Sequence, residues 1–430
     1  MKPYLSFVVL THNNWTLTRQ AIWTLVDSLN DSITREGVEI LIVDNGSTDE
    51  TVAEASEIIA KQNFQDVKVR LVRLEHNMGY PVGINMGLMH TRGDIIGVLN
   101  NDLEFPPGWL DPLLEVLEQD KTVGFVAPYL SFAYSIQNVN VSFANSDEMI
   151  QFAESFMAES KGKVTYVNRL IGACLLFRRD VLTTIGGNDY WYGIGNYDDD
   201  DWCLRANVAG YKVALVGGSF VYHVGHGSFR SGPQQYNDSL ASNGKKFETK
   251  WNIAERHNPT GQYSRVGVVT HTRFQRAFHF IPTSLTEYSQ SKIPILPRTR
   301  SGRRTLLICD WTNSQSDWKA ELQNLLTEGR DQDEVCLWVP QSHFNLEDMA
   351  KEVQQVIARC YNQNQLSVNL FTDEVPAVDL FRILRSADMI AEVPNDFVNR
   401  FIVYLAQKIS LPVSRASSPN VERHENQITS

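Results

Sequence analysis

Four consecutive aspartates, Asp198 to Asp201, precede a segment whose apolar spacing predicts a short amphipathic helix. Helix capping explains one or two of them, because Asp accepts hydrogen bonds from the free N–H groups of a first turn. Neighbouring carboxylates repel each other by about 1 kcal/mol at 4 Å in water, so the third and fourth need another cause. A divalent cation or a proton-transfer step would supply it, with one carboxylate acting as general base towards a hydroxyl.

A further carboxylate, Asp102, ends an apolar run in the sequence Asn100-Asn101-Asp102. One carboxylate at the end of a buried strand suits a divalent cation that keeps several waters and takes its other oxygens from phosphates. Taken alone, Asp102 is better explained as the cap of the next turn. His223 follows another apolar run, where a histidine is more often a structural residue than a metal ligand.

The elements that must position these residues are short apolar runs separated by helical patterns. This alternation predicts βαβ units and a mostly parallel sheet covered on both faces, with ligands bound beyond the carboxyl ends of the strands. The first run ends at Thr11, His12 and Asn13, the second at Asp44, and the fourth at Asp102. Each group alone is also typical of a turn. Their succession predicts one shared binding site.

The order of predicted elements divides the 430-residue chain into four parts. We expect residues 1–257 to form one α/β domain, although residues 131–165 within it show no clear periodicity. Residues 258–302 are basic and contain prolines, which indicates a linker or arm. Residues 303–414 alternate strand and helix patterns again and predict a second, smaller α/β domain, and residues 415–430 form a polar tail that we expect to be disordered.

Composition and charge exclude several classes of protein. A net charge of −11 argues against a nucleic-acid binder, because phosphate backbones require clustered Lys and Arg. The N-terminal apolar run is too short for a signal peptide and no run is long enough to span a membrane, so we expect a cytoplasmic protein. The five scattered cysteines include no Cys-x-x-Cys pair and indicate reduced core residues, not a disulfide framework or a zinc site.

Seven motifs in their order along the chain resemble the inverting family-2 glycosyltransferases, and their style is closest to rhamnosyltransferase-like members. The motifs are FVVLTHNN, ILIVDNGSTDET, HNMGYPVGINMGL, RGDIIGVLNND, GACLLFRRDVL, YDDDDWCLRANVAGYKVALV and VYHVGHGS. The resemblance covers about residues 4 to 255, and the shared order makes it specific. It implies a GT-A, Rossmann-like α/β domain, followed here by the second, smaller Rossmann-like domain.

The resemblance implies a role for each matching position. Asp199 would be the catalytic base and Asp198 its acidic neighbour. Asp102 would bind Mn²⁺ or Mg²⁺ at the donor diphosphate, and His223 matches a histidine that is a metal ligand in some members. Asp44 would accept the ring N–H of a uracil-like or thymine-like base. The other implied nucleotide contacts are Thr11, Asn13, Asn77, Gly79, Asn85, Asn100 and Asn101.

The sequence departs from the family pattern at four positions. Asn100 replaces the first acid of the Asp-x-Asp motif, which weakens any claim that two carboxylates hold the metal. Leu10 stands where a proline is usual, and Ile84 stands where relatives often carry a polar donor contact. Asp200 replaces a residue that is usually apolar, and the sequence assigns it no role.

These implied roles predict transfer of a sugar, with inversion, from a UDP- or dTDP-linked donor to a hydroxyl. The acceptor would be a saccharide, a lipid-linked saccharide or a protein, in the synthesis of surface polysaccharide or glycoconjugate. A catalytically silent sugar-nucleotide-binding or scaffold protein stays open, because Asn100 and Ile84 depart from the pattern. A sugar-nucleotide pyrophosphorylase would need a glycine-rich loop after the first strand, where THNNWTLTRQ has no glycine.

The second domain vaguely resembles half of a GT-B glycosyltransferase domain but lacks a glycine-rich phosphate loop. Because fold resemblance alone gives no activity, we expect it to serve structure, acceptor docking or homo-oligomerisation. The basic arm is explained either as a solvated linker or as a peripheral contact with the inner face of a membrane, where each cation contributes about 1 kcal/mol.

Overall fold

The structure is a computed structural model of the chain. It describes residues 4–29, 37–61, 64, 66–133, 135–225, 233–251, 298–360, 366–372 and 380–414. The chain forms two compact units, and each is described by itself. The first comprises residues 1–291 together with two later segments, Pro340–Asn345 and Asp373–Leu380, and the second comprises the remainder. The predicted tail, 415–430, and the basic arm up to residue 297 lie outside the described residues.

The first unit is built on one mixed sheet in the order β3-β2-β1-β4-β8-β6-β9-β5, with β7 also paired to β9. The first four strands along the chain are parallel to one another, as the alternation of strand and helix patterns predicts. Strand β8 enters antiparallel between β4 and β6. The strands are β1 (Leu5–Thr11), β2 (Val38–Asn45), β3 (Lys68–Leu74), β4 (Ile95–Asn100), β5 (Leu103–Glu104), β6 (Val123–Leu130), β7 (Val164–Val167), β8 (Cys174–Arg178) and β9 (Lys212–His223).

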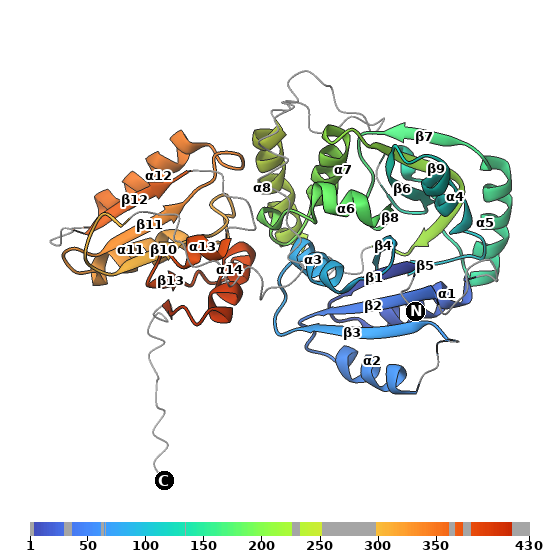
Figure 1. The fold of residues 1–430 in the computed structure, drawn as a ribbon, viewed down its shortest axis with the longest axis horizontal. Coiled ribbons are helices and arrows are strands. Elements are labelled where there is room, and N and C mark those ends of the chain that lie inside the picture. The colour runs from blue at the N-terminus through green and yellow to red at the C-terminus, as the bar shows by residue number, and fades with distance from the viewer. Residues whose placement is uncertain are drawn as a thin grey trace, which may run out of the picture. The chain divides into compact units, whose positions relative to one another are not determined.

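Helices cover both faces of this sheet and give it two hydrophobic cores (Figure 1). Alternate side chains of β1 serve the two cores, Phe7 and Val9 on one face and Val8 and Leu10 on the other. The first core contains residues of α1 (Trp15–Asp27), α2 (Thr51–Ala60) and α4 (Asp111–Gln119). The second contains residues of α3 (Tyr80–His90), α6 (Arg179–Ile185) and α7 (Asp198–Val208).

Helix α3 packs unusually close to the sheet because two glycines face it. A Cβ atom at Gly87 would lie 2.4 Å from Val8 and 2.8 Å from Val43, and one at Gly83 would lie 2.6 Å from Leu10. The close packing fixes the start of α3, where Tyr80 lies, against the carboxyl ends of β1 and β2. The glycines of the HNMGYPVGINMGL motif therefore position one wall of the site.

The region 131–165 contains a helix and a strand that the sequence pattern does not reveal. Helix α5 (Ser146–Ser160) buries only Met149, Ala153 and Ser160 fully, so its apolar period is weak. Its Phe152 and Phe156 pack instead against Phe220 of β9, with ring centroids 5.3 and 5.8 Å apart. The chain then returns as β7 along the opposite half of β9.

The second unit is a parallel five-stranded sheet in the order β12-β11-β10-β13-β14, which confirms the predicted Rossmann-like domain. Its strands are β10 (Arg304–Leu307), β11 (Glu334–Trp338), β12 (Ser367–Phe371), β13 (Met389–Ala391) and β14 (Val413–Ser414). Its helices are α11 (Trp318–Glu328), α12 (Leu346–Arg359), α13 (Leu380–Leu384) and α14 (Phe397–Lys408). Strand β14 is two residues long and has no counterpart among the predicted elements.

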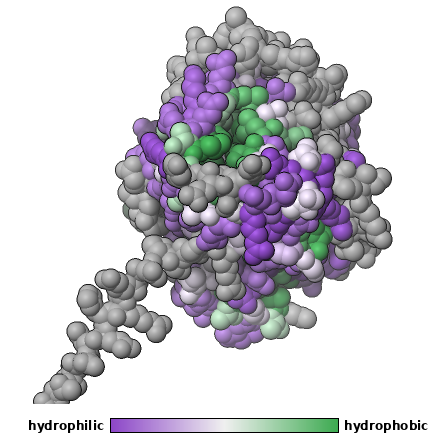
Figure 2. Space-filling model, turned by 90° about the vertical axis from the view of Figure 1, so that its left-hand side faces the viewer, coloured by the Kyte–Doolittle hydropathy of each residue, from purple (hydrophilic) through white to green (hydrophobic). Residues whose placement is uncertain are grey.

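Among the residues coloured in Figure 2, polar ones predominate and apolar ones gather in smaller areas. In the described part of the second unit, Leu370 is the one large apolar residue classed as exposed. No helix in the described ranges combines the length and the apolar character that crossing a bilayer requires.

Candidate active site

The polar residues predicted to converge do end their strands at one edge of the sheet. Thr11 pairs with Asp44 at the ends of β1 and β2, and Leu10 pairs with Asn100 at the end of β4. Asp102 lies two residues after the end of β4, and β9 ends beside it at His223, which pairs with Leu103. The carboxyl ends of four strands therefore meet in one place, where ligands of such sheets bind.

Asp44 carries the strongest sign of a missing ligand. Its side chain is fully buried, and Oδ1 accepts the N–H of Ser47 at 3.1 Å. Oδ2 is buried and has no hydrogen-bond partner among the described residues. An unpaired buried carboxylate oxygen is costly, so a bound N–H group at this point would stabilise the folded protein. The expected contact of Asp44 with the ring N–H of a nucleotide base stays a prediction.

The loops beside Asp44 are tied together by Asn13, whose backbone is left-handed with φ of 57°. Its N–H donates to the Ser47 hydroxyl at 2.7 Å, and its Oδ1 accepts from the N–H of Thr48 at 2.8 Å. Asn tolerates this backbone region better than most residues. Asn13 thus shapes the loop, and its expected contact with the nucleotide stays a prediction.

Thr11 and Asn101 are bonded to each other through Thr18 of α1. The Asn101 amide donates to the Thr18 and Thr11 hydroxyls at 3.0 and 3.3 Å, and the two hydroxyls are 2.7 Å apart. All three side chains are buried. They fix the end of β4 against the start of α1, and therefore the direction in which the chain continues to Asp102.

Asn77 and Gly79 build the loop that enters α3, and the Asn45 side chain holds it. Asn45 donates to Asn77 Oδ1 and to the carbonyl of Gly79, both at 3.1 Å. Gly79 has φ of 81°, and a Cβ atom there would lie 2.0 Å from the carbonyl oxygen of Gly193. Only glycine allows this approach between the α3 loop and the loop that precedes the aspartates.

Asn85 lies deeper than a nucleotide contact would require. Its side chain is buried and makes two hydrogen bonds of 2.7 Å to the backbone of Asn188, one from its amide to the carbonyl and one from the Asn188 N–H. Asn85 therefore holds the segment that leads into the aspartate run.

Asp102 and His223 form the place where a metal would fit. His223 Nε2 lies 3.2 Å from Asp102 Oδ1, and His223 Nδ1 lies 2.7 Å from the carbonyl of Phe132. Burial lowers the pKa of His223, but the hydrogen bond and charge of Asp102 outweigh it and raise that pKa overall. The carbonyl fixes Nδ1–H and leaves Nε2 as the ligand atom, the arrangement that metal-binding histidines use.

The described residues bring together no group of three His, Cys, Asp or Glu side chains that could hold a metal ion. Two protein ligands suit a cation that takes its other oxygens from phosphates and water. Asn100 ends β4 and is half-buried, so it adds no carboxylate to Asp102. The residues present therefore fit Mn²⁺ or Mg²⁺ bound together with a diphosphate.

The four aspartates open helix α7, but none of them caps it. The N-cap is Tyr197, which is left-handed with φ of 66° and makes no side-chain capping bond. Asp198, Asp200 and Asp201 are at most 4% exposed, whereas Asp199 is partly exposed. Asp199 is thus the one carboxylate of the run that solvent or substrate can reach.

Asp199 is held by two backbone N–H groups. Gly172, in the loop before β8, donates to Oδ2 at 2.9 Å, and Asp200 donates to Oδ1 at 2.9 Å. Tyr80 at the start of α3 donates to the Gly172 carbonyl at 3.0 Å and so braces the same loop. Burial raises the pKa of Tyr80 well above its usual value, and the nearby acids Asp198, Asp199 and Asp102 raise it further. Tyr80 is thus joined to Asp199 through Gly172, which bonds to both.

Each of the other aspartates has its own means of stabilisation. Burial and then repulsion by Asp199 raise the pKa of Asp198 well above its usual value, which favours a neutral carboxyl. Asp200, which the sequence left without a role, forms an ion pair of 2.7 Å with Arg169. Asp201 is bound by Arg205 at 2.9 Å.

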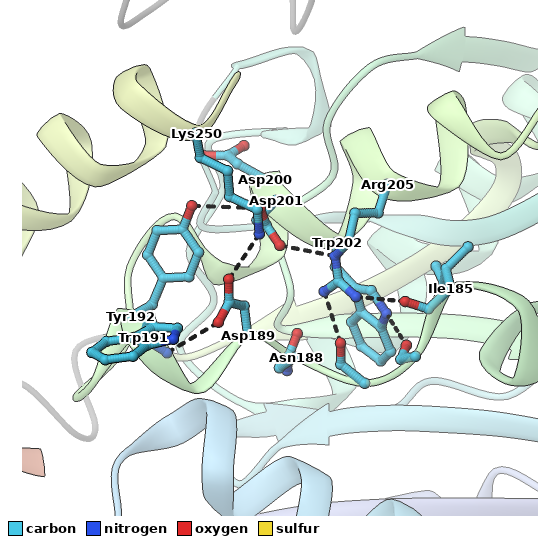
Figure 3. Close-up of polar contacts among 12 residues, drawn as sticks. Ile185, Asn188, Asp189, Trp191, Tyr192, Asp200, Asp201, Trp202, Arg205 and Lys250 are labelled. Carbon is cyan, nitrogen blue, oxygen red and sulfur yellow. Dashed lines mark hydrogen bonds and ion pairs between the residues drawn. The ribbon is translucent and has the colours of Figure 1, made fainter. Parts of the chain in front are cut away.

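A buried network behind the aspartates is shown in Figure 3. Lys250 at the end of α8 (Pro233–Trp251) lies between Asp201 and Asp189, with Nζ 2.5 and 2.7 Å from their oxygens. The same helix holds the loop 191–196, because Asn243 donates to the carbonyl of Tyr192 and Lys246 to that of Trp191, at 2.8 and 2.7 Å.

Sequence reasoning missed this supporting set. Its members are Tyr80, Arg169, Gly172, Asp189, Asn243, Lys246 and Lys250. One signal was present: Asn243, Lys246 and Lys250 recur at helical spacing and share one face of α8. Buried polar residues with that spacing indicate that a helix binds a polar partner and not an apolar core.

Residues 6–186 match the protein family described as glycosyl transferase family 2. Over these residues the first domain is similar to glycosyltransferase family 2. The matched range contains the ends of β1, β2 and β4 and the loop before β8, but stops before the aspartate run. The expected fold, a GT-A-type α/β domain followed by a smaller Rossmann-like domain, is confirmed.

Relatives share this domain and differ in length. The uncharacterized protein y4gI of Sinorhizobium fredii is 25% identical over 230 residues, which cover 51% of this chain and 24% of the relative. The O-antigen biosynthesis protein RfbC of Myxococcus xanthus is 29% identical over 234 residues, 51% of this chain and 17% of the relative. The chain thus spans less than a quarter of either relative.

A solved structure with a related arrangement is the mannosyltransferase PcManGT of Pyrobaculum calidifontis, in complex with GDP-Man and Mn²⁺. It matches 61% of this chain and 68% of its own at 17% identity, with a TM-score of 0.42.

Proposed function

We propose that the family-2 domain transfers a sugar from a UDP- or dTDP-linked donor to an acceptor hydroxyl, with inversion. One observation carries the proposal: Asp199 is the only partly exposed acid of the run, and Gly172, which holds it, precedes Ala173, whose carbonyl accepts the N–H of Asn100 at the end of β4 at 2.8 Å. A base for the acceptor and a holder for the diphosphate thus lie on the same edge of the sheet.

Asp199 takes the proton of the acceptor hydroxyl. The N–H groups of Gly172 and Asp200 fix its carboxylate in one orientation, which limits the motion that would misplace a base. Asp198 stays neutral beside it, so the two carboxyls do not repel each other as two charges would. The activated oxygen attacks the anomeric carbon on the face opposite the nucleotide, which inverts that centre.

The donor is held by the strand ends. Asp44 Oδ2 accepts the base N–H, and Asn13, Asn77, Gly79 and Asn100 belong to the loops that border the nucleotide. Asp102 and His223 would hold Mn²⁺ or Mg²⁺, which would supply the positive charge that stabilises the departing diphosphate. The loops that carry these residues are held by buried hydrogen bonds. Asn101 donates to Thr11, and Asn85 donates to the carbonyl of Asn188.

A role in the synthesis of surface polysaccharide or another glycoconjugate is part of the proposal. It is supported by the family of the domain and by the description of RfbC as an O-antigen biosynthesis protein. The acceptor would be a saccharide, a lipid-linked saccharide or a protein.

The test measures nucleotide release and sugar transfer from a panel of UDP- and dTDP-sugars with Mn²⁺. We compare the wild type with Asp199→Asn and Asp102→Ala, and use Asp180→Asn as a matched control. Asp180 also lies in the first turn of a helix, α6, but its side chain is 62% exposed. Asp199→Asn should keep donor binding and lose about 10²- to 10⁴-fold in transfer. Asp102→Ala should lose the response to added Mn²⁺, and the control should match the wild type.

Two results would reject parts of the proposal. Full activity of Asp199→Asn on a working donor would place the base elsewhere. A wild type that binds a donor but neither hydrolyses nor transfers it, with every acceptor tried, would favour a silent sugar-nucleotide-binding protein.

A further inference from the structure

A short segment from the C-terminal half of the chain belongs to the first unit. Pro340–Asn345 lies between β11 and α12 in sequence, both of the second unit, yet it is part of the first. Its His343 and Phe344 are 1% and 2% exposed. The His343 ring lies 5.9 Å from that of Trp191, and the Phe344 ring meets Trp191 edge-on at 5.5 Å.

His343 makes a directed polar contact in this position. Its Nε2 lies 2.7 Å from Asp189 Oδ2, and because a carboxylate only accepts, Nε2–H is the donor. Its Nδ1 lies 2.7 Å from the Ser342 hydroxyl, which can donate to it. Both ring nitrogens are thus bonded inside the protein, which fixes the orientation of the ring.

The acceptor, Asp189, governs the turn before the aspartate run. Its Oδ1 accepts the N–H of Trp191 and so caps the 3₁₀ turn Tyr190–Tyr192. Burial would raise the pKa of Asp189, but Lys250 and His343 outweigh burial and hold that pKa well below its usual range. His343 and Lys250 therefore share the task of keeping a buried charge in place.

Contacts run without a gap from His343 to helix α7. Asp189 binds Lys250, and Lys250 binds Asp201, which lies two residues after the proposed base (Figure 3). The turn held by Asp189 also leads directly into Gly193, the residue whose carbonyl meets Gly79. A shift of Asp189 would thus disturb Asp199, whereas the loop beside the donor is also held by the Asn45 side chain.

We infer that His343 is a positioning residue for sugar transfer, and that Pro340–Asn345 acts as a clamp on the turn that carries the acidic helix. This inference rests on the proposed function. It assigns part of the C-terminal half a task in the reaction of the family-2 domain, beyond structure, docking or oligomerisation.

The test compares two variants that differ by one methylene group. His343→Gln places an amide N–H where Nε2–H lies and keeps the contact with Asp189. His343→Asn is too short for that contact and keeps only a partner for Ser342. We expect kcat for transfer to fall about 10- to 100-fold in His343→Asn and to return to within a few-fold of wild type in His343→Gln. KM for the donor, and the affinity for UDP with Mn²⁺, should change less than threefold in both.

Hydrogen exchange measured by mass spectrometry gives a readout that does not depend on activity. Exchange in residues 189–199 should rise in His343→Asn and not in His343→Gln, while strand β6 stays protected in both. Equal kcat and equal exchange in the two variants would overturn the inference. If both variants unfold, Ser342→Ala gives the graded comparison, because it keeps the ring and loosens its Nδ1 side. Unchanged kcat and exchange in that variant would then overturn the inference.

The experiments distinguish a wrong role for His343 from a wrong function for the domain. If the wild type transfers sugar and Asp199→Asn does not, the function stands whatever His343 does. If the wild type has no transferase activity, the exchange experiment still decides whether His343 holds the turn.

Discussion

The substitution Gly172→Ala tests the geometry of the proposed base without touching its chemistry. A Cβ atom at residue 172 would lie 3.0 Å from Cβ of Asp199 and 3.6 Å from its Oδ2. Carbon atoms prefer about 3.5–4.0 Å, so the Asp199 side chain or the loop must move by roughly 0.5–1 Å. A displacement of that size in a catalytic group costs up to about 10²-fold in rate. We expect kcat to fall about 10- to 100-fold.

Stability should change little in the same variant. Replacing Gly by Ala reduces the entropy of the unfolded chain and stabilises by about 0.4–1 kcal/mol where the backbone allows it. The backbone of Gly172 is not left-handed, and the close contact with Asp199 offsets this gain. We expect the free energy of unfolding, measured with urea, to stay within about 1 kcal/mol of wild type.

Gly162→Ala is the matched control, in which stability should fall while kcat stays unchanged. Gly162 has φ of 76° in an exposed turn after α5, and a Cβ atom there would meet nothing within 4 Å. The left-handed backbone alone should cost about 1–2 kcal/mol of stability, with kcat unchanged. A Gly172→Ala variant with kcat within twofold of wild type would refute the reasoning, because the base would then tolerate displacement.

Three further substitutions have expected outcomes. Gly79→Ala should destabilise by about 2–5 kcal/mol in urea unfolding, because the new Cβ atom collides with the carbonyl of Gly193 at a left-handed position; a loss below 1 kcal/mol would contradict this. Arg205→Met should cost about 3–5 kcal/mol, since a buried carboxylate and two carbonyls lose their donor; an unchanged Tm would contradict it. In the second unit, burial and then the charge of Asp310 raise the pKa of Asp396 to about 6. The raised value means that the stability from protonated Asp396 is complete below its unfolded pKa and is lost as pH rises through about 6. Asp310→Asn should weaken this loss between about pH 4 and 6.5, and an identical pH profile for the two proteins would contradict the assignment.

Most strands and most helices could be predicted because their periodicity is strong. Strands β1, β2 and β4 are buried along almost their whole length, and such continuous apolar runs between helical patterns define a parallel sheet. Helix α5 could not be predicted, because it lies on the sheet through aromatic edges and exposes most of its surface. The entry of β8 between β4 and β6 is likewise invisible in the sequence, since pairing direction depends on contacts far along the chain.

The positions of site residues that lie at or just after the end of a strand could be predicted from the sequence. The positions of residues that reach the site from segments distant in sequence could not. Asp44 and Asp102 are placed by the strands before them, so their convergence follows from sheet geometry. Arg169, Lys250 and His343 reach the acidic region from separate segments, and a lone cation or histidine in sequence shows no such target. Only the family order of the motifs singled out Asp199 before its exposure was known.

The repulsion among the four neighbouring aspartates is relieved in three ways: by ion pairs, by protonation and by backbone hydrogen bonds. Asp200 and Asp201 are paired with Arg169 and Arg205, and Asp198 is favoured in its neutral form. Within the described residues, Asp199 accepts hydrogen bonds from two backbone N–H groups, which hold a carboxylate without neutralising it. Asp199 is also the only one of the four that is partly exposed. Partial exposure and a fixed orientation are what the proposed general base requires, since it must meet the acceptor hydroxyl within hydrogen-bond reach.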